Sequence, residues 1–104
     1  MAAPWNPPVK GQDFKFPICL EDYNIPGLFI ANPTLAAGDV TISKDGGAFA
    51  NVTTLGTVTP ASGRQVVQEL SATEMTADIL LVVFHDQTVP PQWADTSIGI
   101  VTTA

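Results

Sequence analysis

A serine and a glutamate near the middle of the chain have the spacing of a reciprocal hydrogen-bonded pair. In "LSATEMTAD", residues 70–78, Ser71 and Glu74 stand three residues apart. This is the spacing of a capping box, in which the Ser hydroxyl and the Glu carboxylate each accept a backbone N–H of the other residue. Glu74 is also a candidate catalytic carboxylate, but glycoside hydrolysis uses a pair and no partner is marked. We therefore predict structural roles for both residues.

The single histidine offers little catalytic chemistry. His85 precedes Asp86 at the end of an apolar run, where it could act as a general base, but no Ser or Cys nucleophile in a recognisable motif accompanies it. One His and one Cys, Cys19, cannot supply four zinc ligands without unusual carboxylates. We expect no catalytic residue, no metal site and no cofactor, and we expect the Cys19 thiol to be buried and inert.

The sequence argues less strongly against a calcium site than against a zinc site, because several aspartates lie at predicted turns. Loop carboxylates bind calcium in some β-sandwiches, although no EF-hand spacing is present, and turn formation explains these residues better. A calcium-dependent carbohydrate-binding module stays open as a distant alternative. The aspartates are Asp39, Asp45, Asp78, Asp86 and Asp95.

The segment "DVTISKDGGAFANV", residues 39–52, predicts a β-hairpin. Asp45 and Gly46 favour the positive φ angles of a tight two-residue turn, which would place Ile42 opposite Phe49. The glycines lack the strand and helix context of a dinucleotide-binding loop. Asp45, Gly46 and Gly47 are therefore predicted to be structural.

Further strands follow from alternating apolar residues. In "ILLVVF" both faces are apolar, which predicts a central strand covered by a loop, by the N-terminal arm or by another subunit. Segments 23–39 and 54–64 are expected to be mostly loop, with a short strand near residues 28–30. The other strands are expected near 13–20, 64–70, 79–84 and 98–103.

These elements predict an all-β fold of six or seven short strands in one domain of 104 residues. We expect an antiparallel, immunoglobulin-like β-sandwich over residues 13–104. One short helical turn near 71–77 would form the corner between two sheets.

Residues 1–12 are predicted to be an extended, Pro-rich arm that docks on its own domain or on a neighbouring chain. Trp5 in this arm and Trp93 in a later loop lie among prolines, and each either covers an end of the core or anchors an interface. The residues we assign to an interface are Pro4, Trp5, Pro7, Pro8 and Trp93.

Charge and composition exclude several partners. The chain carries ten acidic and only four scattered basic side chains, for a net charge of −6, so direct nucleic-acid binding is not expected. No signal peptide and no apolar run of about 18 residues is present, so we expect no membrane partner. A lone cysteine favours folding in a reducing cytoplasm.

Four segments resemble a small β-sandwich module of tailed-bacteriophage virion proteins. They are "FKFPICLED", "AAGDVTISKDGGAFANVTTLGTVTPASG", "LSATEMTADILLVVFHDQT" and "QWADTSIGIVTT", and the resemblance covers residues 13–103. In that family the module occurs alone or as the N-terminal part of tail, baseplate or fibre proteins.

The resemblance implies a virion structural protein without catalysis, assembled in the host bacterial cytoplasm. A lone acidic sandwich with an anchoring arm favours a capsid decoration (cement) protein that binds the major capsid protein in a symmetric array, with trimers among the expected arrangements. The alternative is a neck, tail, baseplate or fibre-attachment adaptor that binds other virion proteins.

Overall fold

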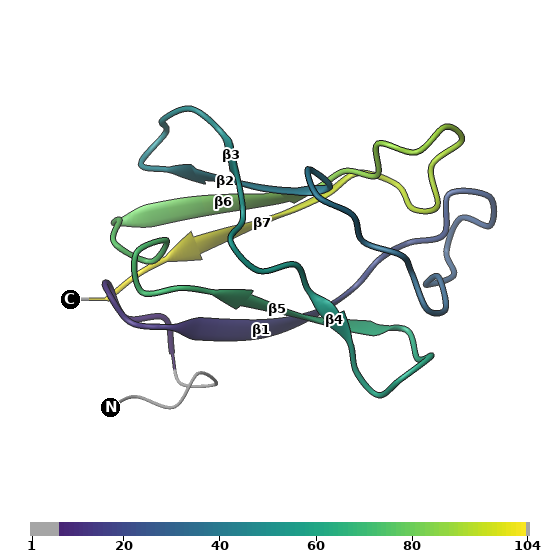
Figure 1. The fold of residues 1–104 in the computed structure, drawn as a ribbon, viewed down its shortest axis with the longest axis horizontal. Helices are drawn as coiled ribbons and strands as arrows, with labels where there is room; N and C mark the ends of the chain where they lie inside the picture. Colours follow the sequence, from purple (N-terminus) through teal and green to yellow (C-terminus); the bar gives the residue numbers. More distant parts are fainter. Residues whose placement is uncertain (1–6, 104) are drawn as a thin grey trace.

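The computed structural model describes residues 7–103, which form two antiparallel sheets packed against each other (Figure 1). One sheet has the order β1-β5-β4 and the other the order β3-β2-β6-β7. The prediction of an all-β, sandwich-like fold with six or seven short strands is confirmed, and the described residues form seven. The strands are β1 (Phe14–Cys19), β2 (Val40–Lys44), β3 (Ala50–Asn51), β4 (Thr57–Val58), β5 (Gln65–Leu70), β6 (Ile79–Phe84) and β7 (Thr96–Val101).

The β6 strand is central, as its two apolar faces predict. It pairs with β2 on one side and with β7 on the other. Leu80, Val82 and Phe84 are buried between the sheets, whereas Ile79 and Leu81 are 51% and 39% exposed. The described part of the chain therefore leaves the outer face of β6 largely uncovered.

The hairpin turn has the predicted type but a different register. Asp45 and Gly46 have φ angles of 52° and 77°, and the Gly47 N–H donates to the Lys44 carbonyl. Ile42 nevertheless pairs with Ala50, so the expected pairing with Phe49 is wrong by one residue. The return segment contains one extra residue before β3 begins, and such bulges are not specified by the turn sequence.

The stretch 71–77 forms the corner that joins β5 in one sheet to β6 in the other (Figure 1). The Met75 N–H donates to the Ser71 carbonyl at 2.9 Å, which closes a single helical turn. No residue between 7 and 103 is in a helix. The chain cannot extend this turn because Asp78 already leads into β6, so the predicted element is only a hydrogen-bonded turn.

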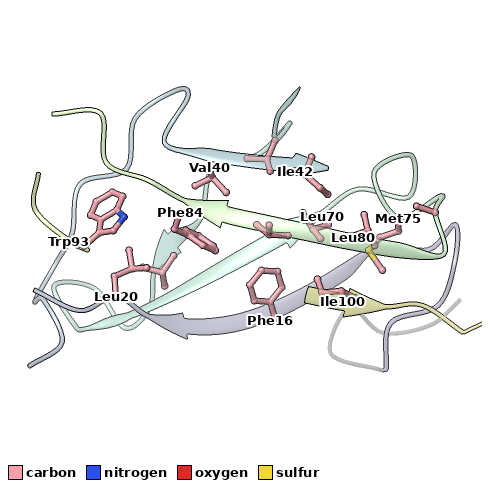
Figure 2. Close-up of a cluster of buried hydrophobic side chains, with 14 residues drawn as sticks. Phe16, Leu20, Val40, Ile42, Leu70, Met75, Leu80, Phe84, Trp93 and Ile100 are labelled. Carbon is pink, nitrogen blue, oxygen red and sulfur yellow. The ribbon is translucent and has the colours of Figure 1, made fainter. Parts of the chain in front are cut away.

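The core lies between the sheets and extends into the corner (Figure 2). The rings of Phe16 and Phe84, one from each sheet, meet edge to face at 6.4 Å between centroids. Met75 from the corner is fully buried with them. Each such apolar side chain stabilises the fold by about 1.5–3 kcal/mol relative to exposure.

Part of the predicted arm docks on its own domain. Val9 forms a parallel bridge with Thr103, just beyond the end of β7, and the Gly11 N–H donates to the Met75 carbonyl at 3.0 Å. Pro8 has no N–H, so it cannot extend this ladder toward Val101. Pro4 and Trp5 lie outside the described residues.

Candidate functional site

Trp93 belongs to the core, and its assignment to an interface is corrected. Its side chain has no exposed surface and lies near Leu20 (Figure 2). A backbone bridge between Asp22 and Trp93 joins the two loops that enclose it. The indole Nε1 finds no acceptor within residues 7–103. Trp93 was predicted either to cover an end of the core or to anchor an interface, and the structure shows that it covers one end of the core.

Ser71 and Glu74 form the predicted capping box. The Ser71 N–H donates to Glu74 Oε1 at 2.8 Å, and the Glu74 N–H donates to Ser71 Oγ at 3.2 Å. The second carboxylate oxygen, Oε2, accepts the Thr53 N–H at 2.8 Å. Glu74 is buried, and both of its oxygens are used to hold backbone segments together.

Two of the aspartates at turns are buried and also organise loops. Asp39 accepts the N–H groups of Ala36 and Gln87, and Asp86 accepts those of Thr88 and Gln92. Burial alone would raise the pKa of Asp86, but the hydrogen bonds from Gln92 and Thr88, with the nearby His85, outweigh it and hold this pKa below its usual value. These carboxylates act as turn acceptors, the role that we predicted.

His85 pairs with Asp95 on the surface. Its Nδ1 lies 2.6 Å from Asp95 Oδ1, and the two side chains are 57% and 70% exposed. The hydrogen bond to Asp95 and the charge of this carboxylate raise the pKa of His85 above its usual value. His85 is thus held as the ion-pair partner of Asp95.

Cys19 lies on β1 in the other sheet, and it is half-buried rather than buried as predicted.

Within residues 7–103, no three His, Cys, Asp or Glu side chains are placed to hold a metal ion. The same residues include no helix long and apolar enough to cross a membrane.

The segment left open by sequence, 23–39, carries a set of exposed apolar side chains. We call residues 23–29 the apolar loop, because it displays Tyr23 (52% exposed), Ile25 (54%), Leu28 (43%) and Phe29 (52%). It lies beside the 85–95 loop at one end of the sandwich, on the right in Figure 1. In a chain of net charge −6, exposed apolar side chains gathered on one loop are typical of a binding surface.

Polar side chains fix the backbone of the apolar loop. Glu21 accepts the Gly27 N–H at 2.8 Å, and Asp22 accepts the Asn24 N–H at the same distance. The Arg64 guanidinium donates to the Phe29 carbonyl, and the Tyr23 N–H donates to the Gln92 carbonyl. The apolar side chains are therefore presented by a preorganised loop, which lowers the entropy cost of binding.

Sequence reasoning missed this surface because the apolar residues of segment 23–29 do not alternate. The available signal was four large apolar residues, Tyr23, Ile25, Leu28 and Phe29, in a segment that turn residues such as Pro26 and Gly27 exclude from a long strand.

Comparison with protein-family models, with curated proteins and with solved structures finds no match to this chain.

Proposed function

We propose that this chain is a non-enzymatic virion structural protein of a tailed bacteriophage, and specifically a capsid decoration protein that contacts the major capsid protein through its apolar loop. The observation that carries the proposal is the set of exposed apolar side chains on a loop whose backbone is fixed by Glu21, Asp22 and Arg64. The resemblance to the phage module supplies the kind of partner. A protein surface with apolar pockets is the partner that such side chains fit.

The strand order supports the finer fold assignment, which is immunoglobulin-like. The sheets β1-β5-β4 and β3-β2-β6-β7 match the B-E-D and C′-C-F-G orders of that fold. The apolar loop then corresponds to the B–C loop and the 85–95 loop to the F–G loop, which lie at the binding end of antibody variable domains.

The alternative is an adaptor of the neck, tail, baseplate or fibre attachment. It uses the same surface and differs in copy number, since a decoration protein covers the whole head whereas an adaptor follows the lower symmetry of the tail. Mass spectrometry of purified virions distinguishes the two: hundreds of copies support decoration, and a copy number near a dozen supports the adaptor. Absence of the chain from virions would refute both roles.

A matched pair of phenylalanines tests the surface. Phe29 on the apolar loop and Phe49 just before β3 are both 52% exposed. Both variants are added to heads that lack the protein. The Phe29→Ser variant should bind the heads at least tenfold more weakly than wild type, whereas the Phe49→Ser variant should bind them as wild type does. Equal binding by the Phe29→Ser variant and wild type would contradict the role of the loop.

A further inference from the structure

The 85–95 loop presents a further apolar side chain at the same end of the sandwich as the apolar loop, on the right in Figure 1. Val89 is 91% exposed, more than any other large apolar side chain in residues 7–103. Gln92 ties the two segments together, because its carbonyl accepts the Tyr23 N–H at 3.0 Å and its Oε1 accepts the Thr34 N–H at 2.9 Å. Val89 and the apolar loop therefore form one surface, carried by two joined loops.

The loops at this end of the sandwich carry most of the negative charge of the protein. Five of the ten acidic side chains lie there, against one basic side chain, Arg64, which is bonded to the Phe29 carbonyl. Even a protonated His85 leaves the negative charge in excess. We call this region the acidic end; its carboxylates are those of Glu21, Asp22, Asp39, Asp86 and Asp95.

The carboxylates of the acidic end lie close to the exposed apolar side chains. Glu21 and Asp22 accept N–H groups of the apolar loop itself. Asp86 accepts the N–H groups of Thr88 and Gln92, on either side of Val89. The hydrogen bonds that it accepts hold the pKa of Asp86 below its usual value, so this buried carboxylate is ionised at neutral pH. The apolar side chains thus emerge from a negatively charged rim.

The three lysines of the chain lie toward the opposite end of the sandwich, where the corner 71–77 joins the sheets (Figure 1). Their partners are Asp78 for Lys10, Glu69 for Lys15 and the Thr73 carbonyl for Lys44. The domain extends 40 Å along its longest axis, whereas exposed charges are screened over about 10 Å at 0.1 M salt. A partner docked on the acidic end is therefore not affected by the lysines.

This distribution of charge sets the chemistry of the partner. Two copies of the chain that met through their acidic ends would repel each other. Apolar side chains rimmed by carboxylates instead fit apolar pockets rimmed by positive charge. Given the decoration role proposed for the apolar loop, on which this inference rests, we propose that the contacted protein surface is basic. Its pockets take the side chains of the apolar loop and Val89, and its Lys or Arg side chains face the acidic end.

The salt dependence of association tests the basic partner. The rate at which the protein binds heads that lack it is measured at about 100 mM and about 500 mM NaCl. Attraction between opposite charges speeds association and is screened by salt, so the rate should fall at least about fivefold at the higher concentration. A rate that stays constant or rises with salt would overturn the inference, because an uncharged or acidic partner gives that result.

A matched pair of aspartates locates the charge that the partner meets. Asp95, whose side chain is 70% exposed, belongs to the acidic end, and Asp13 is exposed just before β1 toward the other end. Lysine at either position changes the net charge equally. At about 100 mM NaCl, the folded Asp95→Lys variant should associate at least about threefold more slowly than wild type, and Asp13→Lys within about twofold of it. Equal rates for the two variants would overturn the assignment to the acidic end.

A matched pair of valines tests whether the contact includes the 85–95 loop. Val89 and Val101, on β7, are 91% and 69% exposed. The Val89→Ser variant should bind heads at least tenfold more weakly than wild type, whereas Val101→Ser should bind them as wild type does. Equal binding by both variants would remove Val89 from the contact and overturn the surface of two loops.

Two outcomes distinguish the basic partner from the decoration role. If the chain binds heads through Phe29 at a rate that is independent of salt, the partner is not basic and the decoration role stands. If the chain binds heads at neither salt concentration, the decoration role is refuted, and the basic partner with it.

Discussion

At the scale of single residues, the Glu74 carboxylate shows which contacts a sequence specifies. Its bond to the Ser71 N–H is local and follows from the three-residue spacing. Its bond to the Thr53 N–H joins segments 21 residues apart in the chain, and no local pattern encodes that contact. The sequence therefore predicts the cap but not the link between the corner and the loop after β3.

Glu74→Ala should destabilise the protein, because it leaves the Ser71 and Thr53 N–H groups without their acceptor. The expected loss is about 1–3 kcal/mol in the free energy of unfolding, measured by urea denaturation. Glu74→Gln keeps one acceptor oxygen and should lose less. Glu69→Ala is the control: its carboxylate is 46% exposed in a 3.9 Å ion pair, so it should cost less than about 1 kcal/mol. Equal losses at the two positions would contradict the role of Glu74.

His85 should titrate above the usual histidine pKa, because its hydrogen bond to Asp95 and the charge of that carboxylate favour the protonated ring. A raised folded-state pKa means that the pair adds stability at pH values below about 6.5, the unfolded value. This contribution disappears as the pH rises through the folded-state pKa. NMR titration of the imidazole measures the shift. Asp95→Asn should return the pKa toward 6.5, and an unchanged value would refute the pairing.

At the scale of elements, the hairpin separates turn type from strand register. The turn type depends on two adjacent residues, Asp45 and Gly46, and was therefore predictable. The register depends on an extra residue before β3, and β3 itself has only two residues. The same brevity concealed β4, Thr57–Val58, because two residues cannot display an alternating pattern.

Gly46→Ala should destabilise the hairpin through backbone strain alone. Its φ is +77°, and an added Cβ meets no atom within 4 Å, so the cost is that of a left-handed L-residue, about 1–2 kcal/mol. For a domain of this size, each kcal/mol lowers the melting temperature by roughly 4–8 °C. Gly99→Ala is the matched control, since Gly99 lacks a positive φ and has open space at its Cβ; it should not lower the melting temperature. A similar fall in both variants would rule out strain as the cause.

At the scale of the whole molecule, alternation predicted the long strands β1, β5, β6 and β7 and hence the two-sheet class. It could not place the aromatic residues of irregular segments. Trp93 and Phe29 both follow prolines or glycines, yet Trp93 has no exposed surface and Phe29 is 52% exposed. The difference arises from how the 85–95 loop pairs with Asp22, which is a long-range contact.

Two deletions distinguish the parts of the arm. Removing residues 1–6 leaves the described contacts of residues 8–11 in place, so this form is the reference for the longer deletion. Removing residues 1–12 also deletes the bonds of Lys10 to Thr103 and of Gly11 to Met75, and should cost about 1–3 kcal/mol by urea denaturation while leaving a folded sandwich. We expect neither the longer nor the shorter form to assemble on its partner if Trp5 is an anchor; assembly of both at wild-type affinity would refute that assignment.

The parallel bridge between Val9 and Thr103 also gives the domain a mechanical property. Two backbone hydrogen bonds, Lys10 N–H to the Thr103 carbonyl and Thr103 N–H to the Pro8 carbonyl, join the two segments. Since the segments run in the same direction, a force that separates residue 7 from residue 103 pulls them along opposite senses of that direction. Both bonds are then loaded in shear at the same time. Stretching the domain between these points should meet its first resistance at this bridge, before either sheet yields.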